Sequence, residues 1–356
     1  VYGATDEAYI ADIYYAASAQ IVAKAAAVLG LEETRQNYQA IADRQWQVVK
    51  EEYFTATGRC AVKTQTGLVL ALKYHLSDNE RLTEQMLRKL LRDNKNKLNT
   101  GFVGTPLLCN VLTEHGMTDL AYRLLLNEEY PGWLHEVKLG ATTVWERWNS
   151  LDENGRISST GMNSLNHYSY GAVLEWIFRH VAGIDVTEQG PGGKMMRISP
   201  KVDYKLGSAS AVYDSASGCY RCGWQIANGD QITVTVTVPF GAKAQVILPY
   251  APDSVYHDTD NPLFETVENG ICCVKAGQYT VTYKAASPLK KSYSVDSTLE
   301  DLLAEPAIRA FLSNMMEVDM IPDLAYGLTL RQAAEAFAGG VSAEQAQRLN
   351  ALLEEF

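Results

Sequence analysis

The sequence predicts three consecutive parts: a helical part, an antiparallel β-sandwich and a small helical tail. Three observations support this order. Apolar residues recur at three- and four-residue steps through successive segments from residue 6 to 129. From about 187 to 287 the segments become short and β-rich, bounded by Gly, Pro, Asn and Asp. After residue 287 the helical spacing returns. We therefore expect domains at residues 1–186, 187–287 and 288–356.

The helical part reads as successive hairpins joined by short Gly- and Asp-bearing turns. The predicted helices span residues 6–29, 32–54, 64–76, 78–94, 104–116 and 118–129, with a last one over 166–184. Hairpins in this arrangement are typical of a helical bundle, toroid or solenoid. No fixed-period repeat is present, which disfavours a consensus solenoid.

Local sequence patterns predict strands in the second part and helix starts in the third. Predicted strands are "KMMRISP", "GCYRCGWQI", "QITVTVTVP", "KAQVILP", "GICCVKAG" and "QYTVTYKA". Their length and bounding turns favour a sandwich. In the tail, Ser297 with Glu300, and Ser342 with Gln345, have the spacing of helix capping boxes.

The charge excludes several classes of partner. A formal net charge of −11 disfavours nucleic acid and anionic membranes, both of which need a basic surface. Residues 296–356 hold eleven acidic and three basic side chains, so the acidity lies mainly in the tail. No run of about 18 apolar residues appears, so no membrane span is expected. A neutral small substrate fits this composition best.

The cysteines and the first residues of the chain give information on the cellular compartment of the protein. Six scattered cysteines in 356 residues slightly favour a reducing, cytoplasmic compartment. Cys219 and Cys222 have CxxC spacing, but no second pair follows, so we expect no metal and no cofactor. Cys272 and Cys273 should point to opposite faces of a strand. Residues 1–30 read as the middle of a domain, so the true N-terminus is expected upstream, and export stays open.

The unusual side chains gather in the loops at residues 98–106, 129–149 and 156–167. Loops on a rigid scaffold commonly carry function. These hold Trp133, His135, Trp145, Glu146, Trp148, Asn163, Asn166 and His167. Aromatic faces combined with carboxylate, amide and imidazole groups suit a sugar, which presents both apolar C–H faces and hydroxyls.

Glu146, between Trp145 and Trp148, is the best candidate for catalysis. A glycosidase needs one carboxyl group to protonate the leaving oxygen and another to activate water or to attack directly. The alternative is that Glu146 forms an ordinary surface ion pair. His167, which opens the last predicted helix, is either a functional residue or a structural histidine. Asn163 and Asn166 either start that helix or hold a sugar hydroxyl, and Trp133 is either a stacking platform or a core ring.

Four stretches resemble one family. "TGFVGTPLL", "GWLHEVKLGATTVWERWNS", "MNSLNHYSYGAVLEWIFRHVAGI" and "PGGKMMRISP" occur in the order found in the bacterial α-L-rhamnosidases of glycoside hydrolase family 78. The resemblance covers about residues 1–250. Its most specific part is "GATTVWERW" followed by "NSLNHYSYG".

The resemblance implies a partial (α/α)6 six-hairpin toroid followed by the sandwich, and inverting hydrolysis of terminal α-L-rhamnose. Glu146 would be the general base and His167 would lie in the sugar subsite. Trp145 and Trp148 match as wall residues. Trp133 and Asn166 join them as expected substrate-binding residues.

One element of the family pattern has no counterpart in the sequence. The segment with the family's general acid is missing, so the chain is expected to be a C-terminal piece with little activity alone. Helix faces left uncovered in such a piece predict a homo-oligomer. The alternatives are a non-catalytic carbohydrate-binding or scaffolding module and a six-hairpin glycosidase for another sugar.

Overall fold

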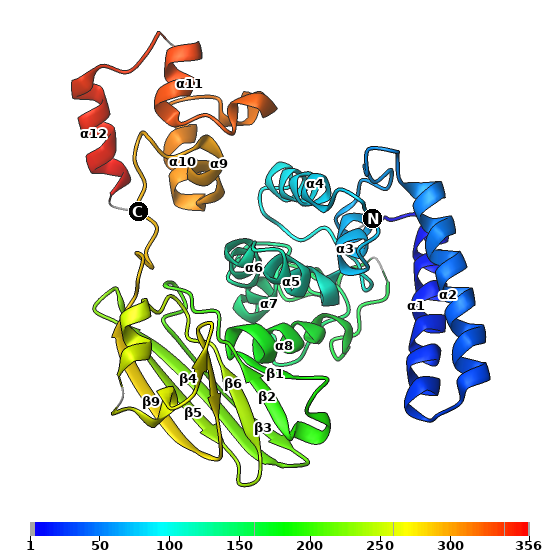
Figure 1. The fold of residues 1–356 in the computed structure, drawn as a ribbon. Helices are drawn as coiled ribbons and strands as arrows, with labels where there is room; N and C mark the ends of the chain where they lie inside the picture. The colour runs from blue at the N-terminus through cyan, green and yellow to red at the C-terminus, as the bar shows by residue number, and fades with distance from the viewer. Residues whose placement is uncertain (1–3, 160, 259, 338, 355–356) are drawn as a thin grey trace.

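A computed structural model describes residues 4–159, 161–258, 260–337 and 339–354 of the chain. Figure 1 shows the helical part, the sandwich and the helical tail in the expected order. One continuous apolar core runs from the helical part into the sandwich, whereas the tail has a separate core. No described helix is both long and apolar enough to cross a bilayer.

The helical part follows the predicted hairpins closely. Its helices are α1 (Glu7–Val28), α2 (Glu32–Tyr53), α3 (Gln65–Lys73), α4 (Glu80–Asp93), α5 (Thr105–Glu114), α6 (Thr118–Leu125) and α7 (Trp133–Lys138). A last helical segment combines the 3-10 turn η1 (Ser169–Ala172), α8 (Val173–Trp176) and the π-helical turn η2 (Ile177–Val181). The helix α7 was not predicted from the sequence, because its six residues are too few to show a helical period.

Side-chain caps fix where several helices begin. The carboxylate of Asp6 accepts the Tyr9 N–H at the start of α1, and Thr64 and Asn79 cap α3 and α4 in the same way. Helix α3 is buried along nearly its whole length, so it forms the centre around which α4 and α5 pack. The long loops that carry the aromatic residues are therefore held on a rigid helical frame.

The α1–α2 hairpin projects from the rest of the helical part (Figure 1). It is attached near its start, where the Tyr9 hydroxyl donates to the Gly67 carbonyl at 3.0 Å. Helix α1 is apolar on most sides, which is typical of a helix with neighbours all round. In this structure, Tyr15, Ile21 and Val28 are nevertheless exposed, Val28 to 88%. The hairpin therefore presents an uncovered apolar surface.

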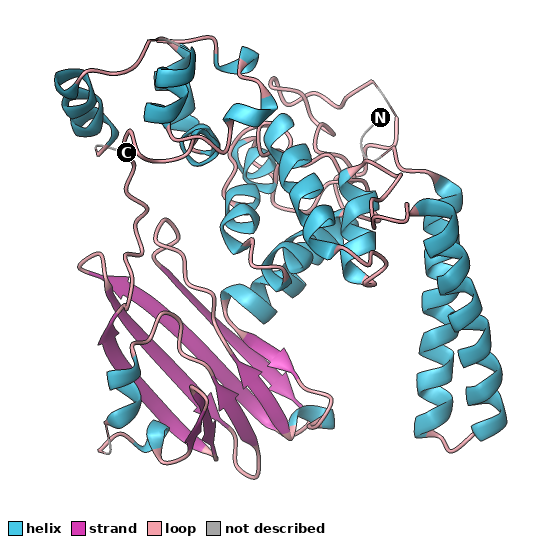
Figure 2. Cartoon of the chain, turned by 45° about the horizontal axis from the view of Figure 1, so that its top comes forward, coloured by secondary structure: helices cyan, strands magenta, loops and turns pink. Residues whose placement is uncertain are grey.

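The sandwich consists of two sheets (Figure 2). Its strands are β1 (Ile184–Val186), β2 (Met195–Ile198), β3 (Ser208–Ser215), β4 (Gly218–Ala227), β5 (Gln231–Val238), β6 (Lys243–Val246), β7 (Val267–Glu268), β8 (Ile271–Val274) and β9 (Gly277–Lys284). The orders are β1-β2-β6-β8-β7 and β3-β4-β5-β9. All pairs are antiparallel except β2 with β6, which is parallel.

Alternation along the strands explains why they were predictable. In β5 every second residue, from Ile232 to Val238, is buried, and the whole strand pairs with β9. Cys272 is buried and Cys273 exposed, which confirms that these neighbours face opposite sides of β8. The sequence missed β3, whose small and polar residues carry little apolar signal. It also missed the short strands β1 and β7.

Hydrogen bonds join the helical part to the sandwich. Strand β1 begins at Ile184, so the sheet starts slightly before the expected boundary at residue 187. The buried indole N–H of Trp224 donates to the Val181 carbonyl at 2.7 Å, and the Tyr122 hydroxyl donates to the Lys201 carbonyl. His180 lies at this junction, where burial lowers the pKa of its imidazole to about 4.

The tail folds around its own core. Its helices are α9 (Leu299–Ala304), α10 (Pro306–Ser313), α11 (Leu330–Phe337) and α12 (Ala343–Leu353). Short 3-10 turns lie at Pro191–Gly193, Asp253–His257 and Pro262–Phe264 in the sandwich, and at Val318–Met320 and Asp323–Ala325 in the tail. The Ser342–Gln345 capping box is confirmed. The predicted box at Ser297 is wrong: Thr298 caps α9 instead, and the Ser297 hydroxyl accepts the Ser294 N–H.

Candidate active site

Two loop segments pair side by side and bring the main predicted residues together. The N–H of Glu146 donates to the Ser164 carbonyl at 2.9 Å, and the N–H of His167 donates to the Val144 carbonyl at 2.8 Å. These bonds tie the segment 144–148 to the segment 163–167. Glu146 and His167, 21 residues apart in the sequence, therefore lie on neighbouring backbone segments.

Glu146 is partly buried, and its carboxylate is held on one side. Its Oε2 accepts the Ser164 N–H at 3.0 Å. An ionised carboxylate accepts about four hydrogen bonds, so capacity remains for a water molecule. No ion pair to Glu146 occurs among the salt bridges of the described residues. The surface ion-pair alternative therefore has no support in the structure.

His167 is presented by stacked rings. Its imidazole stacks on Phe102 with centroids 5.1 Å apart, and on Tyr168 at the same separation. The Ser169 N–H donates to Nδ1 at 3.3 Å, so the neutral ring carries its proton on Nε2, where it can donate to a ligand hydroxyl. The helical segment begins at Ser169, which places His167 in the loop before it and corrects its expected position at the helix start.

The two tryptophans that flank Glu146 are buried. Trp145 is 2% exposed and Trp148 is 1% exposed. Trp148 stacks on Tyr170 with centroids 3.9 Å apart, and its ring meets Trp133 edge-on at 5.4 Å. The structure thus gives both indoles a packing role inside the domain that supports the segment carrying Glu146. Their expected role as walls against a sugar stays a prediction.

Trp133 and Asn166 occupy different surroundings. The indole N–H of Trp133 donates to the Tyr170 carbonyl at 2.9 Å, which favours the core-ring alternative over the stacking platform. Asn166 is exposed, and its backbone N–H donates to the Ser164 hydroxyl at 3.2 Å. The nearby Asn163 uses its side-chain amide to hold the Ser158 carbonyl. Substrate binding by Trp133 and Asn166 stays a prediction.

Sequence reasoning did not single out Phe102, although its loop was marked. Phe102 is 41% exposed and lies between His167 and Tyr170, 5.6 Å from the latter ring. The rings of His167, Phe102, Tyr170 and Trp148 thus form a continuous series from the surface to the core. An aromatic residue in the glycine-flanked stretch "GFVG" was the available signal.

Glu136 was also missed. It lies in α7 and is only 4% exposed, although glutamate is among the residues least often buried. Burial raises the pKa of its carboxyl group to about 8. The only signal for Glu136 in the sequence was its closeness in the chain to the stretch that holds Trp145 and Trp148.

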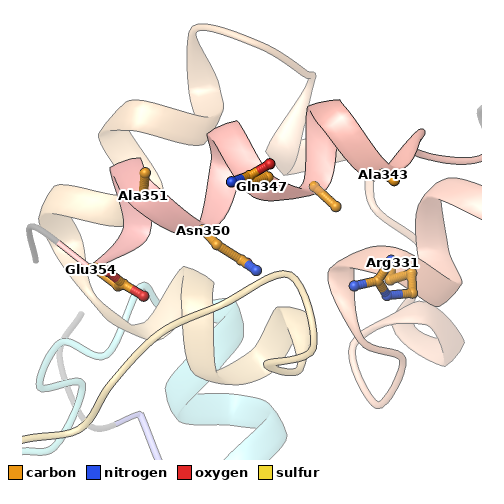
Figure 3. A pocket seen from close by; sticks show the side chains of 7 residues that line it. Arg331, Ala343, Gln347, Asn350, Ala351 and Glu354 are labelled. Carbon is orange, nitrogen blue, oxygen red and sulfur yellow. The ribbon is translucent and has the colours of Figure 1, made fainter.

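The rest of the described chain contains fewer features that could take part in binding or catalysis. No group of three or more His, Cys, Asp or Glu side chains there is placed to hold a metal ion. An open hollow of about 560 Å³ lies in the tail, distant in sequence from the loops above (Figure 3). Alanine and amide side chains of α12 line most of it, and its Arg331 already pairs with Asp296 at 2.8 Å. The chemistry therefore concentrates at Glu146 and His167.

Two family models match most of the chain. The model of the bacterial α-L-rhamnosidase six-hairpin glycosidase domain matches residues 1–181, and that of the bacterial α-L-rhamnosidase C-terminal domain matches residues 183–261. The chain belongs to the bacterial α-L-rhamnosidase family. The resemblance expected from the motifs is confirmed, as is the helical glycosidase domain followed by a sandwich.

Relatives and solved structures support the same assignment. An α-L-rhamnosidase of Formosa agariphila is 36% identical over 75% of this chain, and one of an Alteromonas species is 36% identical over 78%. The structure of a Streptomyces avermitilis α-L-rhamnosidase complexed with L-rhamnose matches with a TM-score of 0.69, 32% identity and 78% coverage. That of an Aspergillus terreus enzyme has a TM-score of 0.70, 27% identity and 80% coverage. The chain spans 27–31% of the length of these rhamnosidases.

Proposed function

We propose that this chain forms part of the catalytic region of an inverting α-L-rhamnosidase, which releases terminal α-L-rhamnose from glycosides. The observation that carries the proposal is the pairing of the Glu146 segment with the His167 segment, within a chain whose relatives are α-L-rhamnosidases. Its net charge of −11 supports a neutral sugar substrate rather than nucleic acid or an anionic membrane.

Glu146 acts as general base in this proposal. It takes a proton from a water molecule on the face of the sugar opposite the leaving group, while the Ser164 N–H holds Oε2 in place. The Nε2–H of His167 donates to a sugar hydroxyl, and Phe102 contributes an apolar face. An inverting enzyme keeps its two carboxyl groups about 6.5–9.5 Å apart to admit the water. The proton donor is proposed to lie on a segment outside these 356 residues, as in the family pattern.

Substrate turnover tests the proposed function. The full-length natural protein should hydrolyse an aryl α-L-rhamnoside with a kcat/KM at least about 100-fold above those for aryl β-D-glucosides and β-D-galactosides, because pocket hydrogen bonds discriminate between sugars. Proton NMR should show β-L-rhamnose as the first product. Preference for another sugar would contradict the substrate, and first release of the α-anomer would contradict inversion.

The exposed apolar surface of α1 predicts self-association of the 356-residue chain. Large uncovered apolar patches drive association, and Ile21 and Val28 lie in the exposed part of the hairpin. Light scattering at tens of micromolar should therefore give a mass above that of a monomer. The double variant Ile21→Glu/Val28→Glu should shift this mass toward the monomer. A monomeric wild-type chain at every concentration would refute the prediction.

A further inference from the structure

The helical tail contacts the helical part through Arg92, near the end of α4. The guanidinium carbon of Arg92 lies over the ring of Tyr326, 4.1 Å from the ring centroid. Its Nη1 lies 3.7 Å from Oε1 of Glu300 in α9, and its Nε lies 3.6 Å from the neighbouring Asp93. The Arg92 side chain is only 15% exposed. A cation that has lost most of its water needs an aromatic face or an opposite charge nearby, and the tail supplies both.

The two tail residues that meet Arg92 are bonded to each other. The Glu300 N–H donates to the Tyr326 carbonyl at 3.0 Å, and the preceding Leu299 N–H donates to the Leu328 carbonyl at 2.9 Å. Leu299 itself is buried in the core of the tail. The fold of the tail therefore places a carboxylate and an aromatic ring side by side. We call this pair, Glu300 and Tyr326, the guanidinium site.

A second ion pair joins the tail to the sandwich. Nζ of Lys205, in the turn before β3, lies 2.7 Å from Oε2 of Glu305, between α9 and α10. Lys205 is 60% exposed, so this pair is expected to contribute little to the free energy of docking. Leu289, in the connection between β9 and α9, also packs against the main core. The tail thus touches both the helical part and the sandwich.

Net charge does not explain why the tail lies against the rest of the chain. Residues 296–356 hold eleven acidic and three basic side chains, a net of −8, which leaves −3 of the total −11 for residues 1–295. Two bodies of like net charge repel each other. Specific contacts have to outweigh this repulsion, and the mostly buried Arg92 is better placed to do so than the exposed Lys205.

We propose that the guanidinium site docks the tail onto α4 by binding Arg92, with the pair of Lys205 and Glu305 as a weaker second contact. Arginine suits the site because its planar guanidinium can stack on a ring while it pairs with a carboxylate, whereas the ammonium of lysine is a compact point charge. The docking is partly ionic, so salt weakens it. The matched family models end at residue 261 and assign no role to the tail. The inference does not depend on the role of Glu146.

Tryptic cleavage between the sandwich and the tail measures docking in the full-length natural protein. Lys290 and Lys291 lie in this connection, outside any helix or strand, and both are exposed. A docked tail fixes both ends of the connection and slows its entry into a protease. Arg92→Leu should therefore raise the cleavage rate about tenfold at low salt, because cleavage follows the population of the released tail. Arg92→Lys keeps the charge but not the planar stack, so it should raise the rate about threefold.

A matched control and a double variant test whether the contact itself is responsible. Arg81 is an exposed arginine at the other end of α4, and Arg81→Leu should keep the wild-type cleavage rate. Tyr326→Leu should act like Arg92→Leu, and the double variant should be cleaved no faster than the faster single variant, because both changes remove one contact. About 0.5 M NaCl should speed cleavage of the wild type more than that of Arg92→Leu, with rates normalised to an unstructured peptide.

Two results would overturn the proposal. One is a wild-type cleavage rate in Arg92→Leu, and the other is a double variant in which the two single effects multiply. Arg92 lies outside the core of the tail, so its replacement leaves the fold of the tail intact. If Tyr326→Leu unfolds the tail, mass spectrometry will also detect cleavage after Arg309 and Arg348, inside α10 and α12. The rates of Arg92→Leu, Arg92→Lys and the control then decide the question alone.

Discussion

Replacing Glu146 with glutamine should lower kcat for aryl α-L-rhamnosides by about 10³-fold in the full-length protein. A general base contributes about 10²–10⁴-fold to rate, and an amide cannot take the proton from water. The amide oxygen can still accept the Ser164 N–H, so the loop conformation should survive. KM should change little, because Glu146 acts on water and the sugar contacts remain. Initial rates across a range of substrate concentrations provide the measurement.

A nearby glutamate serves as the control for this substitution. Glu153 is exposed in the following turn, and Glu153→Gln should keep wild-type kcat. The experiment also separates a hydrolase from a carbohydrate-binding module. A binding module would release no rhamnose with either variant, and its affinity for the glycoside would survive Glu146→Gln. Full activity in Glu146→Gln would exclude the general-base role.

Much of the fold was predictable because its signals are local. The helices α1 to α6 show helical spacing over eight or more residues, and the alternation in β5 and β9 is direct. The missed elements lack such signals: α7 has six residues, and β3 is built from small and polar side chains. The parallel pairing of β2 with β6 depends on the path of the chain, which no local pattern encodes.

The site was predictable at the level of its segments. Glu146 and His167, which the loop composition and the family resemblance had singled out, lie on paired backbone segments. The fine geometry was not predictable, because burial is decided by packing across distant segments. Trp145 and Trp148 looked like possible sugar contacts from composition, yet both are buried. Glu136 lies in a stretch that was expected to be a loop and was not singled out, yet it is buried.

Trp148 carries the second large expected effect, on stability rather than on chemistry. Trp148→Ala should lower the free energy of unfolding by about 3–5 kcal/mol, the usual cost of removing a large buried aromatic ring. The ring is 1% exposed, and its removal would leave a cavity between Tyr170 and Trp133. Urea denaturation followed by circular dichroism measures the change. A loss below about 1 kcal/mol would contradict the packing role.

A graded series identifies the cause of that loss. Trp148→Phe retains a ring to stack on Tyr170 and also removes the indole Nε1, which is buried without a hydrogen-bond partner. It should therefore cost clearly less than alanine, because part of the lost packing is offset by the removal of an unsatisfied donor. Phe240 is 96% exposed, so Phe240→Ala should change stability by less than about 0.5 kcal/mol. Equal losses in the alanine and phenylalanine variants at position 148 would show that stacking of a ring on Tyr170 contributes nothing to stability.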